Sequence, residues 1–296
     1  MDRRSATTSI AAAAAAVATL VAAGSRPAAA KAPGAARPSF IETDDGASLF
    51  HLDWGTGKPV VFTHAWSLNA DIWEYQLVEL ADQGLRCVAY DRRGHGRSSD
   101  PGRGYDYDRL ADDLAAVIDQ LDLSDVTLVA HSMGNGEAVR YLRRHGSARI
   151  ARLVMLSTVP PQSTSDFGPL IAGLKQDRPA FLAKGVIAFT GGHPAVSPAM
   201  TEWIVTQFMR ASPKATIDCM RAISGGDFHA DMQAVTVPTL IAHGDKDVVN
   251  PLDTTARKVA KLIPGSTLKV YEGAPHGLVI THRDRLARDI LSFAHG

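Results

Sequence analysis

The feature of this sequence that most constrains its fold is a series of short apolar runs separated by segments with helical spacing. The runs are PVVFTH (59–64), RCVAYD (86–91), VTLVAH (126–131), RLVMLS (152–157), PTLIAH (238–243) and LKVYEG (268–273). Such runs are typical of strands buried on both faces. Amphipathic helices are predicted between them, at 72–81, 107–121, 134–144 and 254–262. This alternation predicts an α/β fold, with a mostly parallel sheet covered by helices on both faces.

Two segments depart from this alternation. The residues before the first run alternate between apolar and polar around Asp45-Gly46, a pair that favours a hairpin, so we expect the sheet to begin antiparallel. The interval from Pro160 to Val237 has no clear strand and contains the breakers GGHP and SGGD. We therefore predict an inserted helical cap at about 160–236.

Length and charge limit the possible partners. The 296 residues are 45% hydrophobic, enough for one large domain, and 31 basic residues balance 31 acidic ones. Because no excess positive charge would attract a polyanion, we expect a small-molecule substrate and no nucleic acid. Cys87 and Cys219 are too few for a disulfide framework and are expected to be buried thiols. The oligomeric state is left open.

The first forty residues resemble an export signal. A basic start, an apolar run of 14 residues from Ile10 to Ala23 and small residues before Ala30 predict a signal peptide at 1–30. A flexible linker at 31–38 and the main domain at 39–296 would follow. The run is too short for a stable membrane anchor. We expect an exported protein, periplasmic or secreted, and Arg3-Arg4 favours the twin-arginine route. The alternative is a disordered cytoplasmic tail.

Polar residues that suit acyl transfer follow several of the predicted strands. Ser132 lies between the strand at 126–131 and a helix, where a sharp turn would expose its hydroxyl and direct backbone N–H groups at a reacting oxygen. The alternative is an ordinary serine at a helix N-terminus. His276 follows the last strand in a turn between Pro275 and Gly277, as a general base requires. An acid that orients this histidine would be Asp245 or Asp247.

Two backbone N–H groups are expected to bind the oxyanion of a tetrahedral intermediate. They are the amide of Met133, directly after the serine, and that of Trp66, in the loop after the strand at 59–64. Trp66 could instead serve core packing. The 11 histidines form no H-x-H or H-E-x-x-H pattern, so no metal or other cofactor is predicted. The glycines of RRGHGR lack nucleotide-loop spacing, which makes 91–98 a structural turn.

Taken together, these residues resemble the α/β-hydrolase superfamily, and within it the cofactor-free haloperoxidase, perhydrolase and aryl esterase family. The resemblance extends from about Ser39 to the C-terminus. The segments that carry it are NADIWEYQ (69–76), YDRRGHGRSS (90–99), HSMGNGEAVRY (131–141), SPKATIDCMRAISGGDF (212–228) and YEGAPHGL (271–278).

The resemblance implies a triad of Ser132, Asp247 and His276, an oxyanion hole at Trp66 and Met133, a helical cap and no metal. It favours Asp247 because the family's acid stands shortly before a proline, here Pro251. Asp245, nearer the strand, would instead bond loop amides.

The sequence departs from the family at Ala65, Ala130 and Asn135, where glycine is usual, and at Ser67, where perhydrolases often have proline. We expect hydrolysis of small carboxylic esters through an acyl-enzyme. The alternative enzyme is a perhydrolase that uses hydrogen peroxide. Because Ser67 lacks the ring that would fix the backbone beside Trp66, hydrolysis should dominate, and Ser67→Pro should favour peroxide. A non-catalytic binding protein is the alternative of another class, and Ser132 excludes an aspartate-nucleophile dehalogenase.

Overall fold

Residues 39–296 are described by a computed structural model, so the expected signal peptide and linker lie outside the described residues. Eight strands form one sheet in the order β1-β2-β4-β3-β5-β6-β7-β8. Their bounds are β1 Phe40–Glu42, β2 Ser48–Trp54, β3 Pro59–Thr63, β4 Arg86–Tyr90, β5 Val126–His131, β6 Ile150–Leu156, β7 Thr239–Gly244 and β8 Thr267–Tyr271. The mostly parallel α/β fold is confirmed, and each apolar run gives one of the strands β3 to β8.

The antiparallel start of the sheet is also confirmed. β1 and β2 form a hairpin, and β2 pairs antiparallel with β4, whereas every later pairing is parallel. Gly46 takes the hairpin turn at a φ of 85°, a left-handed conformation that glycine adopts without steric cost.

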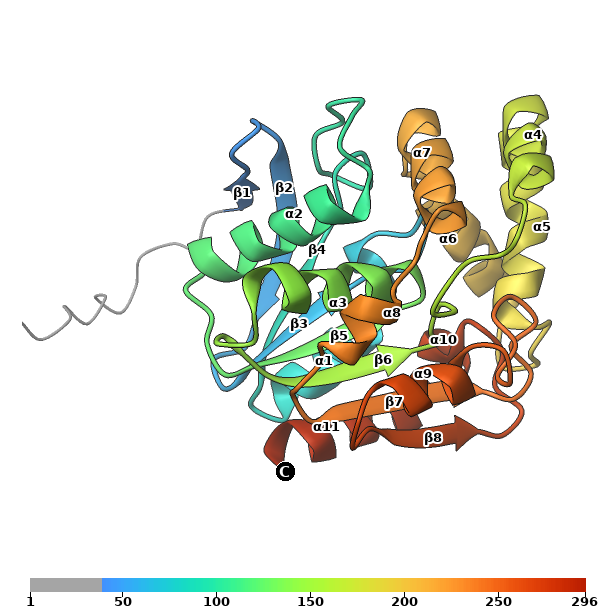
Figure 1. The fold of residues 1–296 in the computed structure, drawn as a ribbon. Helices are drawn as coiled ribbons and strands as arrows, with labels where there is room; N and C mark the ends of the chain where they lie inside the picture. Colours follow the sequence, from blue (N-terminus) through green and yellow to red (C-terminus); the bar gives the residue numbers. More distant parts are fainter. Residues whose placement is uncertain (1–38) are drawn as a thin grey trace, which may run out of the picture. The chain divides into compact units, whose positions relative to one another are not determined.

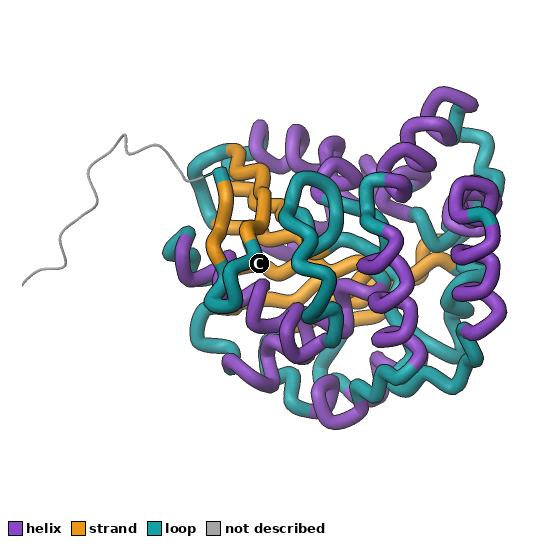
Figure 2. Tube along the Cα trace, turned by 90° about the horizontal axis from the view of Figure 1, so that it is seen from above, coloured by secondary structure: helices purple, strands orange, loops and turns teal. Residues whose placement is uncertain are grey.

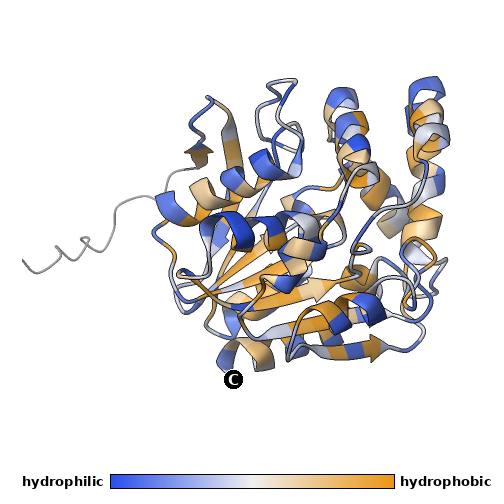
Figure 3. Cartoon of the chain, in the orientation of Figure 1, coloured by the Kyte–Doolittle hydropathy of each residue, from blue (hydrophilic) through white to orange (hydrophobic). Residues whose placement is uncertain are grey.

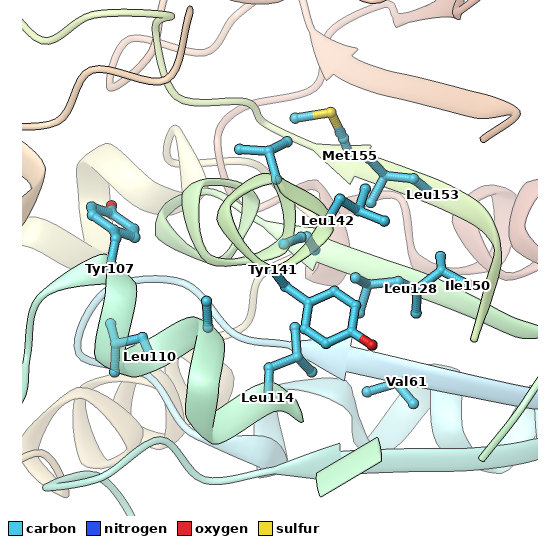
Figure 4. Packing of buried hydrophobic residues seen from close by; sticks show 14 of the residues in the cluster. Val61, Tyr107, Leu110, Leu114, Leu128, Tyr141, Leu142, Ile150, Leu153 and Met155 are labelled. Atoms are coloured by element: carbon cyan, nitrogen blue, oxygen red, sulfur yellow. The ribbon is translucent and has the colours of Figure 1, made fainter. Parts of the chain in front are cut away.

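Both faces of the sheet are buried, and alternate strand residues point to opposite faces. In β3, Val61 joins one hydrophobic cluster, whereas Val60 and Phe62 join the other. Figure 4 shows the first cluster, beneath α2 (Tyr107–Gln120) and α3 (Met133–His145).

Helices cover both faces, as Figure 2 shows. The face of Val61 also carries α9 (Ala256–Leu262), and the opposite face carries η1 (Ala70–Trp73), α1 (Glu74–Asp82), α10 (Leu278–Thr281) and α11 (Arg283–His295). In Figure 3 the central strands are mostly hydrophobic, whereas the covering helices carry both hydrophilic and hydrophobic residues. This difference is expected because a covering helix buries only one side.

The segment predicted as a cap folds into helices between β6 and β7. They are α4 (Gly168–Gln176), α5 (Arg178–Thr190), α6 (Pro198–Met209), α7 (Pro213–Ser224) and the short α8 (His229–Gln233). Figure 1 shows α4 to α7 together on the side towards which the arrows of β6 and β7 point. The last part of the predicted range differs from the rest, because α8 packs beside α3 and α9 and Met232 joins the cluster beneath α2 and α3. The helices that form a cap are therefore α4 to α7.

Local sequence explains where the cap helices begin. The side chains of Asp177, Ser197 and Ser212 accept hydrogen bonds from backbone N–H groups at the starts of α5, α6 and α7. Each of these helices has proline in its first two positions, where a missing N–H costs no helical hydrogen bond. Cys87 and Cys219 are free and buried, as predicted.

Candidate active site

Ser132 lies at the tight turn between β5 and α3. Its backbone has a φ of 53° and a ψ of −117°, a conformation that residues other than glycine rarely adopt. The turn is held by the Ser132 amide, which donates to the carbonyl of Leu156 at 2.9 Å. Gly134 is required because a Cβ there would lie 2.3 Å from Oγ1 of Thr63. Packing against β3 and β6 thus maintains the strained backbone that presents the Ser132 hydroxyl.

Asn135, which replaces a glycine of the family pattern, braces this turn. Its Nδ2 donates to the carbonyl oxygens of Ser132 and Leu156, both at 2.9 Å. Because the first carbonyl belongs to the turn and the second to β6, the Asn135 side chain connects them. Ala130, the other departure near the turn, is fully buried within β5.

The structure brings Ser132, His276 and Asp247 into one hydrogen-bonded chain. Nε2 of His276 lies 2.9 Å from Oγ of Ser132, and Nδ1 of His276 lies 2.7 Å from Oδ2 of Asp247. All three side chains are buried, although the serine is 8% exposed. A carboxylate can only accept, so Nδ1 of His276 carries a proton and Nε2 is free to accept the serine proton.

The Asp247 carboxylate is kept ionised by the groups around it. Its Oδ1 accepts from the amides of Val249 and Asn250 at 2.9 and 2.8 Å, and Nε2 of His243 lies 3.3 Å from its Oδ2. Burial acts to raise the pKa of Asp247, but attraction to His276 and hydrogen bonds from His243, His276 and Asn250 outweigh it and lower the pKa below its usual value.

Asp245 has a different position. It is exposed, and its Oδ1 accepts from the amide of Gly273 at 2.7 Å, which ties the loop after β7 to the loop after β8. This is the loop-bonding role expected for it. Asp247, and not Asp245, contacts His276.

The loop after β3 carries Trp66, the second expected oxyanion donor. Within residues 39–296, no hydrogen bond occupies the backbone amide of Trp66 or that of Met133. The indole Nε1 of Trp66 donates to the carbonyl of Thr216 in α7 at 2.9 Å, so the side chain holds the cap while the amide stays available. Ala65, where the family has glycine, lines the cavity beside Trp66.

Ser67 corrects one expectation. Its φ is 60°, and its Oγ donates to the carbonyl of Phe208 in α6 at 3.0 Å. Proline holds φ near −65°, so it cannot stiffen this backbone in its present form. The argument that Ser67→Pro would fix the oxyanion loop in place is therefore wrong. Such a variant must rebuild the loop.

A buried polar network lies beneath the same loop. The Arg92 guanidinium donates to the carbonyl of His64 at 2.8 Å and to the Glu137 carboxylate at 2.7 Å, and Tyr90 donates to that carboxylate too. In the adjoining turn at 91–98, Oδ1 of Asp91 accepts from a backbone amide at 2.7 Å. These contacts agree with the structural role predicted for this turn.

A cavity of about 300 Å³ opens onto Ser132 and His276 beneath the cap. Its aromatic lining consists of Trp66, Phe167, Phe181, Phe189, Phe208 and Phe228. No lysine, arginine, aspartate or glutamate of residues 39–296 lines it. A cavity of this size and composition suits an uncharged organic molecule.

Comparisons with known proteins agree with this fold. The model of the "alpha/beta hydrolase fold" family matches residues 58–195. The chain is 41% identical to a non-heme chloroperoxidase of Kitasatospora aureofaciens, over 85% of this chain and 97% of that protein. It is 35% identical to a bifunctional esterase/perhydrolase of Acinetobacter calcoaceticus, over 86% of this chain and 98% of that protein. A bromoperoxidase structure from Bacillus anthracis is 36% identical, with a TM-score of 0.83 and coverage of 87% and 99%.

The fold and these similarities define an α/β hydrolase. More narrowly, the chain belongs to the non-heme haloperoxidase and esterase family of that fold. Its relatives of known structure include an esterase from Exiguobacterium antarcticum, which is 34% identical over 87% of this chain and 99% of that chain, with a TM-score of 0.82.

Residues 39–296 contain no cluster of three or more histidine, cysteine, aspartate or glutamate side chains suited to a metal ion. No helix in the same range has the length and apolarity needed to cross a membrane.

Sequence reasoning missed several residues around the site. Asn250 and Ser157 both contact it. Ser157 ends the apolar run at 152–157 and could have been included among the strand-end residues, whereas Asn250 lies seven residues after the run at 238–243. The cap aromatics, such as Phe189 and Phe208, had no such signal, because only the tertiary fold brings them to Ser132.

Proposed function

We propose that this protein hydrolyses small, uncharged carboxylic esters through an acyl-enzyme formed on Ser132. The observation that carries the proposal is the chain of hydrogen bonds from Ser132 through His276 to Asp247. The aromatic cavity above these residues supports a neutral substrate. The same contacts favour an enzyme over a non-catalytic binding protein, since binding alone requires no base beside the serine.

In the first half of the reaction, Oγ of Ser132 attacks the ester carbonyl carbon while Nε2 of His276 accepts the hydroxyl proton. The carbonyl oxygen becomes an oxyanion, which we assign to the amides of Trp66 and Met133. The bond to the alcohol oxygen then breaks, and His276 returns the proton to that oxygen. The neutral alcohol leaves, and Ser132 is acylated.

In the second half, His276 takes a proton from water as the water oxygen attacks the acyl carbon. The bond to Oγ of Ser132 breaks, the proton returns to the serine, and the carboxylic acid leaves. Asp247 stays ionised throughout and stabilises the positive charge on His276, which its lowered pKa favours.

Perhydrolysis is the second candidate, and the bifunctional esterase/perhydrolase among the relatives favours it. Hydrogen peroxide would replace water in the second half, giving a peracid from the same acyl-enzyme. The expectation that hydrolysis dominates stands without the argument from Ser67, which the φ of 60° at that residue overturns.

A panel of p-nitrophenyl esters of increasing acyl length, assayed with and without hydrogen peroxide, tests both reactions. We expect ester turnover that disappears in Ser132→Ala, with less peracid than carboxylic acid at comparable nucleophile concentrations. Absence of turnover across the panel contradicts the proposal, and peracid in excess makes perhydrolysis the main reaction.

We also propose that the protein is exported to the periplasm or secreted, and that a signal peptide is removed near Ala30. The basic start and the apolar run of Ile10 to Ala23 support this, and Arg3-Arg4 favours the twin-arginine route. Mass spectrometry of the mature protein tests it. A chain that begins near Lys31 is expected, and an intact Met1 start in the cytosol contradicts it.

A further inference from the structure

His276 sits in a loop, and two side chains from neighbouring strands hold its backbone. The loop lies between β8 and α10, outside the ladder of the sheet. The carbonyl oxygen of His276 accepts from Nε2 of His131 at 3.0 Å and from Oγ of Ser157 at 2.8 Å. Both donors are fully buried. His131 ends β5, and Ser157 directly follows β6.

The protonation state of His131 follows from these contacts. A carbonyl oxygen can only accept, so Nε2 of His131 carries the proton. Nδ1 of His131 is buried and has no partner among the described residues, so a second proton on this nitrogen would form no hydrogen bond. Burial and repulsion from His276 lower the pKa of His131 to about 3. His131 is therefore a neutral donor, unsuited to acid–base chemistry at neutral pH.

The chain order gives His131 a special position. It directly precedes Ser132, so consecutive residues of one turn contact His276 at two points: the hydroxyl of Ser132 meets Nε2 of the ring, and the imidazole of His131 binds the carbonyl. Ser157 adds a second support, and its own amide donates to Ala242 in β7 at 3.0 Å.

We propose that His131 and Ser157 are positioning residues, which fix the distance from His276 to Ser132 by holding the His276 backbone carbonyl. The proposal rests on the hydrolase function proposed above. Neither residue needs to touch substrate. Both act through His276, whose ring must stay within a few tenths of an ångström of its productive position for proton transfer.

The test removes both donors in the variant His131→Phe/Ser157→Ala. Phenylalanine keeps a flat ring of similar size, and alanine deletes one hydroxyl. Because a small displacement of a reacting group costs up to about 10²-fold in rate, we expect kcat for a p-nitrophenyl ester to fall about 10- to 100-fold. KM should stay within about threefold, because the cavity wall is unchanged.

Rescue separates positioning from structural support. The variant His131→Gln/Ser157→Ala has a side-chain N–H donor that His131→Phe/Ser157→Ala lacks. Its kcat should therefore lie between that of the phenylalanine double variant and that of wild type. Thr239→Val is the matched control, because the Thr239 hydroxyl is also buried and donates to the carbonyl of Val237 at 2.9 Å, at the start of β7 and so at the opposite end of that strand from Asp247. It should lower thermal stability without lowering kcat.

The proposal is overturned if the double variant keeps kcat within about threefold of wild type, if only KM changes, or if glutamine gives no recovery. If the double variant does not fold, the single variant Ser157→Ala replaces it, and a kcat within about threefold of wild type again overturns the proposal. Ser132→Ala distinguishes the two levels of failure. If the Ser132→Ala variant still turns over the ester, the hydrolase proposal itself is wrong. If Ser132→Ala abolishes turnover but the double variant keeps its kcat, only the positioning role of His131 and Ser157 is wrong.

Discussion

The strand-end site and the helical cap are built in different ways. Ser132, Asp247 and His276 each follow a strand of one sheet, so the register of the strands brings the segments that carry them to one edge of the sheet. The cap helices α4 to α7 join no strand ladder and are placed by packing and by a few bonds to the body of the domain.

Three of the bonds that hold the cap use its backbone, whereas others, such as the bond from Nδ2 of Asn69 to Oε1 of Gln207 at 3.1 Å, use a cap side chain. Trp66 donates to the carbonyl of Thr216, Ser67 to that of Phe208, and the amide of Gly277 to that of Phe189, at 2.9, 3.0 and 2.6 Å. A backbone carbonyl is present whatever the side chain. The side chains of Thr216, Phe208 and Phe189 can therefore change while these three bonds keep the cap attached.

This difference teaches where chemistry and specificity reside. The sheet edge holds Ser132 and His276 within hydrogen-bonding distance, and the cap supplies an apolar wall to the cavity. Changes at the sheet edge should therefore affect kcat, and changes in the cap should affect the choice of ester.

The largest expected effect is that of Ser132→Ala. Removing the nucleophile of a triad lowers kcat by about 10⁴ to 10⁶. The fold should persist, since only one hydroxyl is lost, and circular dichroism with thermal unfolding checks this. A variant that keeps more than a tenth of wild-type kcat, in a preparation free of wild-type enzyme, would refute the nucleophile assignment.

Asp247→Asn should come next. Loss of the acid leaves His276 in the wrong tautomer and lowers kcat by about 10⁴. Asp245→Asn is the matched control two residues away. Its bond to Gly273 is a loop contact worth about 1 kcal/mol, so stability should fall slightly while kcat stays near wild type. Measuring kcat for both variants tests the assignment. If Asp245→Asn loses activity and Asp247→Asn does not, Asp245 is the acid.

The cap should discriminate against charge. Because no lysine or arginine of residues 39–296 lines the cavity to pair with a substrate carboxylate, a half-ester with a free carboxylate should be hydrolysed with kcat/KM at least about 10²-fold below its neutral methyl diester. Competition assays between the two esters measure the ratio of their kcat/KM values.

Ile223→Arg sharpens this test of the cap. Ile223 lines the cavity from α7 and is only half-buried, so an arginine can be accommodated there and can pair with the carboxylate. In this variant the kcat/KM of the half-ester should come closer to that of the neutral diester. Equal rates for the two esters in the wild-type enzyme would show that the cap wall does not select by charge.

The smallest expected effect is the change in stability caused by Ser67→Pro. The native φ of 60° is unavailable to proline, so the free energy of unfolding should fall by more than about 1 kcal/mol. Ser67→Ala, which deletes only the bond to Phe208, should cost less. Denaturant unfolding of the two variants compares them, and a proline variant more stable than the alanine variant would contradict the observed backbone.

Much of the sheet could be predicted because its signal is local. An apolar run such as 126–131 is too short for a helix and too apolar for a loop, and it became β5 without a shift at either end. The position of Ser132 after that strand was predictable for the same reason. Asn135 could be identified only as a departure from the family pattern, because its bond to Leu156 joins residues 21 apart.

The sequence by itself determined that strands and helices alternate, that Ser132 and the other candidate site residues follow strands, and that 160–236 is largely helical. Each of these properties depends on periodicity or turn chemistry within about ten residues. Only the tertiary structure decided that Asp247 and not Asp245 contacts His276, that Ser67 has a positive φ, and that cap aromatics such as Phe189 line the cavity. These outcomes depend on contacts between segments far apart in the chain, whose geometry is set by packing rather than by local preference.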